Sequence, residues 1–243
     1  MQRIDMPKRA NNQRNTRRTK IDSNIDTSDI TPLNNKQREY IKVIQHNSVV
    51  ICTGVLGSSK TYIPAVIAAD MLLNKEIDRI VIARPAEGRG KSVGFLPGTK
   101  DEKLLPWCAP VTETIKKRVG TGNFEAFLHN GRIELLDLTN AKGRTYDDTF
   151  LIIDEAEDLE PDVAKTLVTR HGQNTKMVIT GDVAQQDLKA TSGLQVLLQV
   201  SKYTSLPIPH IDFDSWDYCV RSEESKMWGM AFEQWDKSEN GWK

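Results

Sequence analysis

The fold of this chain is constrained most by eight consecutive residues, Gly54-Val55-Leu56-Gly57-Ser58-Ser59-Lys60-Thr61. They follow a β-like apolar run, 48–52, and precede a helix-like run, 62–73. A glycine-rich loop between a strand and a helix is typical of a P-loop, whose backbone N–H groups and helix N-terminus bind phosphate. The pattern predicts that these residues bind a nucleotide, with Lys60 on the β- and γ-phosphates and the Thr61 hydroxyl on Mg²⁺.

One position departs from the P-loop pattern, because Ser59 stands where the motif has glycine before the lysine. If φ at Ser59 is positive, its Cβ is strained and crowds the phosphate. If φ is negative, serine fits and its hydroxyl adds a donor. The alternative interpretation of the whole stretch is an ordinary Gly-Ser turn between a strand and a helix.

A second element ends a predicted strand with two acids, in the sequence Phe150-Leu151-Ile152-Ile153-Asp154-Glu155. Four apolar residues are typical of a buried strand, and open α/β sheets bind ligands at the carboxyl ends of their strands. As a Walker-B-like motif, the element predicts that Asp154 holds Mg²⁺ through water. Glu155 is then expected to orient and deprotonate the attacking water. Taken alone, such an acidic pair is often only a strand exit.

A third strand also ends in a polar turn, Val178-Ile179-Thr180-Gly181-Asp182-Val183-Ala184-Gln185. We expect Gln185 to hydrogen-bond the γ-phosphate or the attacking water, since an amide both donates and accepts. Asp182 is expected to brace the loop. The alternative is again a simple strand exit.

Composition limits the classes of function. Lys and Arg number 33, as do Asp and Glu, so the net charge of zero gives no global reason to expect nucleic acid. The 3 cysteines are widely spaced and form neither a disulfide framework nor a metal-ligand pattern, which indicates a reducing compartment. No apolar run approaches the ~20 residues of a membrane span, and the N-terminus lacks a signal-peptide core. We therefore expect a cytoplasmic protein without membrane contact.

The first 30 residues of the chain differ from the rest, because they are basic and contain few apolar residues. Such a segment cannot bury a core, so we expect residues 1–30 to be a disordered tail, either merely solvated or a basic arm for nucleic acid. Residues 31–243 are expected to form a single domain. The segment 87–106 lacks periodicity and is predicted to be a long functional loop.

Strand-like and helix-like runs alternate along the rest of the chain. Continuous apolar strands predict a mostly parallel sheet with helices on both faces, an α/β fold. Strands are expected at 49–52, 79–83, 132–136, 149–153, 176–180 and 210–213, and helices at 34–45, 60–73, 110–119, 124–129, 161–170, 194–200 and 223–235.

The last predicted helix carries apolar residues at helical spacing, namely Trp228, Ala231, Phe232 and Trp235. We expect this helix to pack on the core. A subunit interface is the second interpretation and base stacking the third.

The sequence between these elements contains further motifs. They are Thr31-Pro32 with Asn34 and Gln37, Ala83-Arg84-Pro85, Gly94-Phe95-Leu96-Pro97-Gly98 with Glu102-Lys103 and Pro106-Trp107, and Gly143-Arg144-Thr145. The three nucleotide-binding elements in this order resemble the first ATP-binding domain of superfamily 1 helicases. With the further motifs, residues 31–232 resemble the PhoH-like ATPase family, in the short stand-alone form that phages and bacteria carry.

The resemblance implies a RecA-like P-loop NTPase fold, with ATP and Mg²⁺ as ligands and ATP hydrolysis as the activity. It implies that Gln37 reads the adenine edge and that Arg221 serves as an arginine finger, which a neighbouring subunit would supply. Arg84 and Arg144 fall in family motifs and are expected to contact phosphate or nucleic acid, the alternative being structural ion pairs. Residues 154–158 carry acids where the family usually has amides.

Three functions follow from these patterns. The first is an ATPase that acts on single-stranded RNA or DNA in a helicase-like way. Because the chain has one RecA-like domain, it would complete its site as a homo-oligomeric ring, such as a hexamer. The second function is a nucleotide-binding switch with little turnover, for which Ser59 is the reason. A small-molecule kinase is the third, and the absence of a recognisable substrate lid speaks against it.

Overall fold

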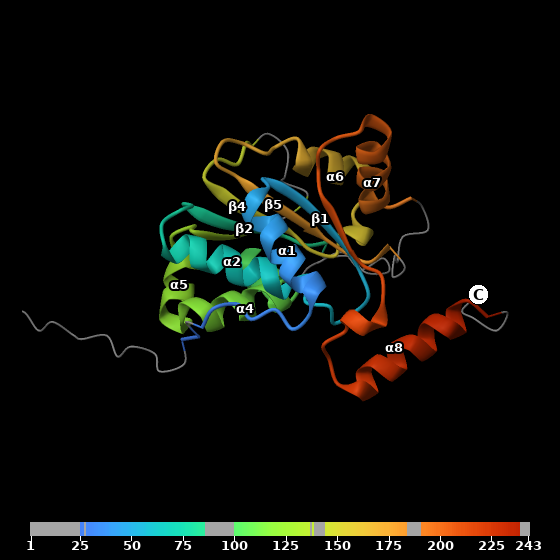
Figure 1. Ribbon diagram of the computed structural model, residues 1–243. Helices are drawn as coiled ribbons and strands as arrows, with labels where there is room; N and C mark the ends of the chain where they lie inside the picture. The colour runs from blue at the N-terminus through green and yellow to red at the C-terminus, as the bar shows by residue number, and fades with distance from the viewer. Residues whose placement is uncertain are drawn as a thin grey trace, which may run out of the picture.

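The computed structural model describes residues 25, 26, 28–85, 100–136, 138, 144–183 and 191–238 (Figure 1). Its centre is a sheet of β1 (Val49–Gly54), β2 (Arg79–Ala83), β3 (Ile133–Leu136), β4 (Thr149–Ile153), β5 (Lys176–Thr180) and β6 (His210–Phe213). The strand order is β3-β2-β4-β5-β1-β6, and every neighbouring pair is parallel. The predicted α/β fold with a parallel sheet is therefore confirmed.

Eight α-helices connect and extend the strands in the described part of the chain. They are α1 (Asn35–His46), α2 (Tyr62–Leu73), α3 (Lys100–Leu104), α4 (Ala109–Val119), α5 (Thr121–His129), α6 (Pro161–Val168), α7 (Gly193–Thr204) and α8 (Glu223–Asp236). Two 3₁₀ helices, η2 (Ala156–Asp158) and η4 (Trp216–Tyr218), follow β4 and β6. The helix α3 lies within the segment predicted to be a long loop, and residues 87–99 of that segment lie outside the described residues.

Helices cover both faces of the sheet (Figure 1). One face packs against α1, α2, α4 and α5, whose core residues include Tyr40, Ile63 and Ile115. The other face packs against α6 and α7, through Leu167 and Leu194 among others. Every residue of β4 is buried, as its continuous apolar sequence predicts. This layering leaves the carboxyl ends of the central strands free to form a site.

The folded part of the chain begins earlier than the sequence predicts. The Asp26 N–H donates to the carbonyl of Lys117, and the Arg118 guanidinium donates to the carbonyls of Asp26 and Ser28. Arg118 also forms a bidentate pair with Asp70, at 2.5 and 2.8 Å. Residues 26 and 28 are thus held on α4, so the expected start of the domain at residue 31 is wrong. Residues 1–24, on which the tail prediction depends, lie outside the described part.

The predicted packing of the C-terminal helix on the core is also wrong. No residue of α8 is buried, and Trp228 is 66% exposed. The helix points away from the sheet and touches the rest of the domain at η4 (Figure 1), where Gly229 lies against the Trp216 ring and the Trp216 indole N–H donates to Glu233. Helical spacing predicted the helix, but its apolar face is exposed to solvent.

Within the described residues, none of the helices has the length and apolar character needed to cross a membrane.

Candidate nucleotide-binding site

A cavity of about 420 Å³ lies at the carboxyl ends of the central strands. It is lined by P-loop residues 56–61, by Arg84 after β2, by Asp154 and Glu155 after β4, and by Arg221 after β6. Four segments that are far apart in the sequence therefore meet where the sequence predicts a phosphate site. The volume lies in the range of small-molecule sites in proteins.

Two glycines of the P-loop have a positive φ. Gly54 has φ 124° and is pressed against β6, since a Cβ there would lie 2.3 Å from the carbonyl oxygen of Phe213. Gly57 has φ 71°. The Lys60 ammonium folds back over the loop and donates to the carbonyls of Gly54 and Val55. It is therefore held at the loop, where a P-loop lysine meets phosphate.

Ser59 adopts a positive φ, which is the strained one of the two conformations considered above. Its φ is 74°, in the left-handed region that favours glycine. Its hydroxyl accepts a hydrogen bond from the Gln37 side-chain amide at 3.2 Å. The loop thus keeps the shape that glycine would give it. The serine is strained in this shape, because its Cβ disfavours a positive φ.

We expect Ser59→Gly to raise the free energy of unfolding by about 1 kcal/mol, because glycine adopts positive φ without strain. The control is Ser58→Gly, since Ser58 is buried, has no positive φ and donates from its hydroxyl to the carbonyl of Val55. That change should destabilise the protein. Chemical denaturation of the three proteins measures both effects. Equal or lower stability in Ser59→Gly would show that the conformation carries no strain.

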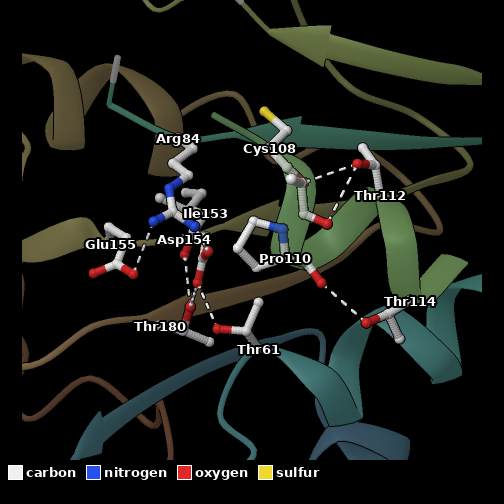
Figure 2. Close-up of polar contacts among 11 residues, drawn as sticks. Thr61, Arg84, Cys108, Pro110, Thr112, Thr114, Ile153, Asp154, Glu155 and Thr180 are labelled. Atoms are coloured by element: carbon white, nitrogen blue, oxygen red, sulfur yellow. Dashed lines mark hydrogen bonds and ion pairs between the residues drawn. The ribbon is translucent and has the colours of Figure 1, made fainter. Parts of the chain in front are cut away.

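Thr61 and Asp154, the two residues predicted to hold Mg²⁺, lie in contact, and Thr180 joins them (Figure 2). The hydroxyls of Thr61 and Thr180 each donate to Asp154 Oδ1, at 2.7 Å. Burial raises the pKa of Asp154, while Arg84 and these hydroxyls act in the opposite direction. Mg²⁺ prefers oxygen ligands and is held by one or two protein groups together with phosphates. The Thr61 hydroxyl and the Asp154 carboxylate fit that requirement.

Arg84 lines the cavity, and its guanidinium lies beside Asp154 and Glu155 (Figure 2). Its guanidinium donates to Asp154 Oδ2 at 2.8 Å and to Glu155 Oε1 at 3.1 Å. Arg84 thus forms ion pairs, as its alternative interpretation expects, but with acids that line the cavity, and its contact with phosphate or nucleic acid remains a prediction. Glu155 has φ 53°, a left-handed conformation at the point where the chain leaves β4.

Gln37 lies under the P-loop. It is 3% exposed, its Oε1 accepts from the Leu33 N–H at 2.8 Å, and its Nε2 donates to the carbonyl of Ser58 at 3.3 Å. Its amide is therefore engaged by the protein on both sides. Contact of Gln37 with adenine remains a prediction.

The other predicted residues lie in three different places. Arg221 packs its side chain over Gly57 of the same chain, and the Val220 N–H donates to the Gly57 carbonyl at 2.9 Å. Arg144 lies away from the cavity and forms a bidentate pair with Glu134 on β3, at 2.5 and 3.0 Å. This is the structural ion pair that was the alternative for Arg144. Gln185 lies outside the described residues.

Three residues of the site were given no role from the sequence. Thr180 ends β5 and contacts Asp154. The Tyr40 hydroxyl donates to the carbonyl of Lys60 at 3.1 Å, and Glu157 lines the cavity. The sequence could have indicated a role for Thr180, because its hydroxyl stands at the end of a predicted strand, as Asp154 does. Nothing in the sequence indicated the contact of Tyr40 with the P-loop, because its position on an apolar helix face predicts core packing alone.

Comparison with known proteins agrees with this geometry. A family model described as "PhoH-like protein" matches residues 29–233. The PhoH-like protein of Synechocystis is 38% identical over 169 residues, which are 69% of this chain and 52% of that protein. The PhoH-like protein of Bacillus subtilis is 39% identical over 168 residues, 68% of this chain and 53% of that protein.

Protein PhoH of Escherichia coli is 34% identical over 178 residues, 72% of this chain and 50% of its own length. The chain spans about half the length of these curated relatives. Among solved structures, Pif1 helicase from Candida albicans has a TM-score of 0.40 and 16% identity, covering 76% of this chain and 40% of that one. That likeness is too weak to assign a function.

Proposed function

The chain belongs to the family of PhoH-like proteins, and on that premise we propose that it binds ATP with Mg²⁺ and hydrolyses it. The observation that carries the proposal is the 2.7 Å hydrogen bond between the Thr61 hydroxyl and Asp154. It joins the P-loop to the acidic end of β4, which are the two protein parts that P-loop enzymes use to hold Mg²⁺. When bound, Mg²⁺ would neutralise charge on the β- and γ-phosphates.

The chain's own residues divide the work of hydrolysis in this proposal. P-loop N–H groups and Lys60 bind and orient the phosphates. Glu155 takes a proton from the attacking water, and Arg84 and Arg221 stabilise the negative charge that spreads over the transferring group. Gln185, if placed as the sequence predicts, helps to orient the water.

We further propose that hydrolysis is coupled to single-stranded RNA or DNA. The order of the motifs supports this, since it resembles that of a helicase ATP-binding domain.

A homo-oligomeric ring, such as a hexamer, is the proposed assembly, and the exposed aromatic side chains of α8 support a subunit contact. The thiols of Cys52 and Cys108 are free and buried, which fits the reducing cytoplasm as the proposed location.

Steady-state ATP hydrolysis with Mg²⁺, compared between the wild type and Lys60→Ala, tests the ATPase. We expect Lys60→Ala to lower turnover by at least about a hundredfold, because it removes a preorganised positive charge from the phosphates. Lys42→Ala is the matched control, since Lys42 is exposed on α1 outside the site. Equal turnover in the wild type and Lys60→Ala would refute hydrolysis at this site.

The same assay with single-stranded RNA or DNA at low salt tests the coupling, because phosphate contacts are strongest there. Stimulation by either polymer supports it, and the absence of both binding and stimulation contradicts it. A specific observation favours a second function, a nucleotide switch: the P-loop holds Ser59 at a positive φ, where the motif has glycine. ATP binding without turnover in the wild type would support the switch.

A further inference from the structure

The aromatic face of α8 consists of Trp228, Phe232 and Trp235, which are 66%, 49% and 45% exposed. The rings of Trp228 and Phe232 stack on each other, with 5.8 Å between their centroids. These side chains lie roughly 100° or more around the helix axis from Glu233, which bonds to Trp216 on η4. The contact with η4 therefore leaves the aromatic face open, and an exposed apolar surface of this kind marks an interaction site.

A groove on the same chain has the chemistry to receive such a face. This α7–β6 groove lies between the end of α7 and the edge strand β6, and its volume is about 490 Å³. Its apolar lining is formed by Ile51, Leu198 and Leu206. Leu206 is 46% exposed, so this lining is open to solvent. Pockets of this kind take the aromatic anchors of protein interfaces.

The groove also offers hydrogen-bond acceptors, which a buried indole N–H requires. Ser201, Ser205 and His210 line it. The Thr53 hydroxyl donates to Asp212 Oδ1 at 2.7 Å and lies 2.7 Å from His210 Nε2. Since a hydroxyl has one hydrogen, it accepts from the Nε2–H of His210, which fixes the imidazole ring and leaves Nδ1 as an acceptor. A tryptophan side chain, with an apolar body and one N–H, matches this combination.

The charges of the two surfaces are also complementary. From Glu223 to Asp236, α8 carries four acids and one lysine. By contrast, α7 carries Lys202, which lines the groove, and no acid. Opposite charges favour the approach of α8 to the groove. The same acids repel the phosphates of nucleic acid, so a protein surface suits this helix better.

The two surfaces lie at opposite ends of β6. His210 begins the strand and lines the groove, whereas α8 follows the carboxyl end of the strand through η4. In Figure 1, α7 lies in the upper part of the molecule and α8 in the lower part.

We propose that the aromatic face of α8 docks in the α7–β6 groove of a second copy of this chain. Such a contact joins two unlike surfaces, so it repeats head to tail and either closes a ring or extends a filament. The proposal rests on the proposed homo-oligomeric assembly and names the two surfaces that form it.

Two variants of the full chain remove one surface each. Trp235→Glu places a charge on the aromatic face, and Leu206→Glu places one in the groove. Analytical ultracentrifugation of a dilution series without nucleotide should show an oligomeric wild type. Each variant should raise the dissociation constant at least about thirtyfold, as the loss of an interface hot spot does.

Each variant has a matched control. Val200→Glu makes the same kind of change on α7, because Val200 is 45% exposed and does not line the groove. Gln234→Glu adds a charge to α8, at an exposed position roughly 100° around the axis from Trp235. Both controls should assemble like the wild type.

Mixing the two interface variants tests how the surfaces pair. An equimolar mixture should form a dimer, because Leu206→Glu supplies an intact α8 and Trp235→Glu supplies an intact groove. A chain with both substitutions should stay monomeric. If α8 instead contacted a second α8, Leu206→Glu would assemble like the wild type, and the proposal would be overturned.

A monomeric wild type, wild-type assembly in either interface variant, or a mixture without dimer would also overturn the proposal. So would intact assembly of Trp235→Glu together with a loss of single-stranded RNA or DNA binding, since the face would then stack on bases. A filament that both variants abolish supports the contact and contradicts the proposed ring. If the wild type assembles as expected but shows no ATP turnover that depends on Lys60, the proposed ATPase fails while this contact stands.

Discussion

Glu155→Gln should lower the turnover number for ATP by about 10²- to 10⁴-fold, which is the usual contribution of a general base. The reason is chemical, because an amide of the same shape takes no proton from water. The Kd for ATP should change little, since Asp154 still binds Arg84 at 2.8 Å and Thr61 at 2.7 Å. Steady-state kinetics gives the turnover number, and titration with a fluorescent ATP analogue gives the affinity.

The control for this variant is Glu160→Gln, which makes the same chemical change on an exposed side chain. It should leave both quantities at the wild-type level. If Glu155→Gln turns ATP over at the wild-type rate, another group accepts the proton. If it loses ATP binding together with turnover, Glu155 supports the pocket rather than the reaction.

Arg221→Ala should lower turnover by about 10³-fold, within the range that arginine fingers contribute. The Arg221 side chain packs over Gly57 of its own P-loop, so its charge lies beside the predicted phosphate position without help from another chain. Multiple-turnover ATP hydrolysis measures the effect. Arg38→Ala is the control, since Arg38 is exposed and bonds to Asn35 of its own helix.

Mixing two inactive variants decides which chain supplies the arginine. If Arg221 acts within its own chain, a mixture of Arg221→Ala and Lys60→Ala stays inactive, because no single site holds both groups. If a neighbour supplies it, mixed rings combine an intact Lys60 with an intact Arg221, and activity returns. Full turnover in Arg221→Ala alone would remove this residue from the reaction.

Local patterns predicted the parallel sheet and the edge of it at which the P-loop and the acids after β4 meet. The apolar sequence of β4 and the acids that follow it placed Asp154 and Glu155 at the carboxyl end of a buried strand. The glycine-rich sequence predicted a loop between a strand and a helix, and residues 54–61 join β1 to α2 in this way. These features were predictable because strand burial, glycine conformation and parallel pairing depend on short stretches of sequence.

Other features depend on contacts between distant segments, which a single sequence does not reveal. The φ of Ser59 is set by the shape of the whole loop, not by serine itself. Arg118 holds residues 26 and 28 from 90 or more positions away, so composition placed the start of the domain too late. For α8, helical spacing predicts an apolar face but not the surface against which that face packs, so the expected packing on the core was wrong.

Glu157 shows the same limit at the site. In the sequence it is one of several acids after β4, and nothing distinguishes it from Asp158. In the structure it is 2% exposed and faces the cavity. Burial raises the pKa of its carboxyl group to about 9, which no pattern in the sequence predicts.

The junction between Arg221 and α8 has a mechanical consequence. The helix begins at Glu223, so Ser222 alone separates it from Arg221. Its 14 residues make an arm about 21 Å long that is fastened to the domain at η4. We expect a displacement of the far end of α8 to move the segment that carries Arg221, because one residue joins the two. The Gly229–Trp216 contact would limit that movement, since it holds the helix against η4.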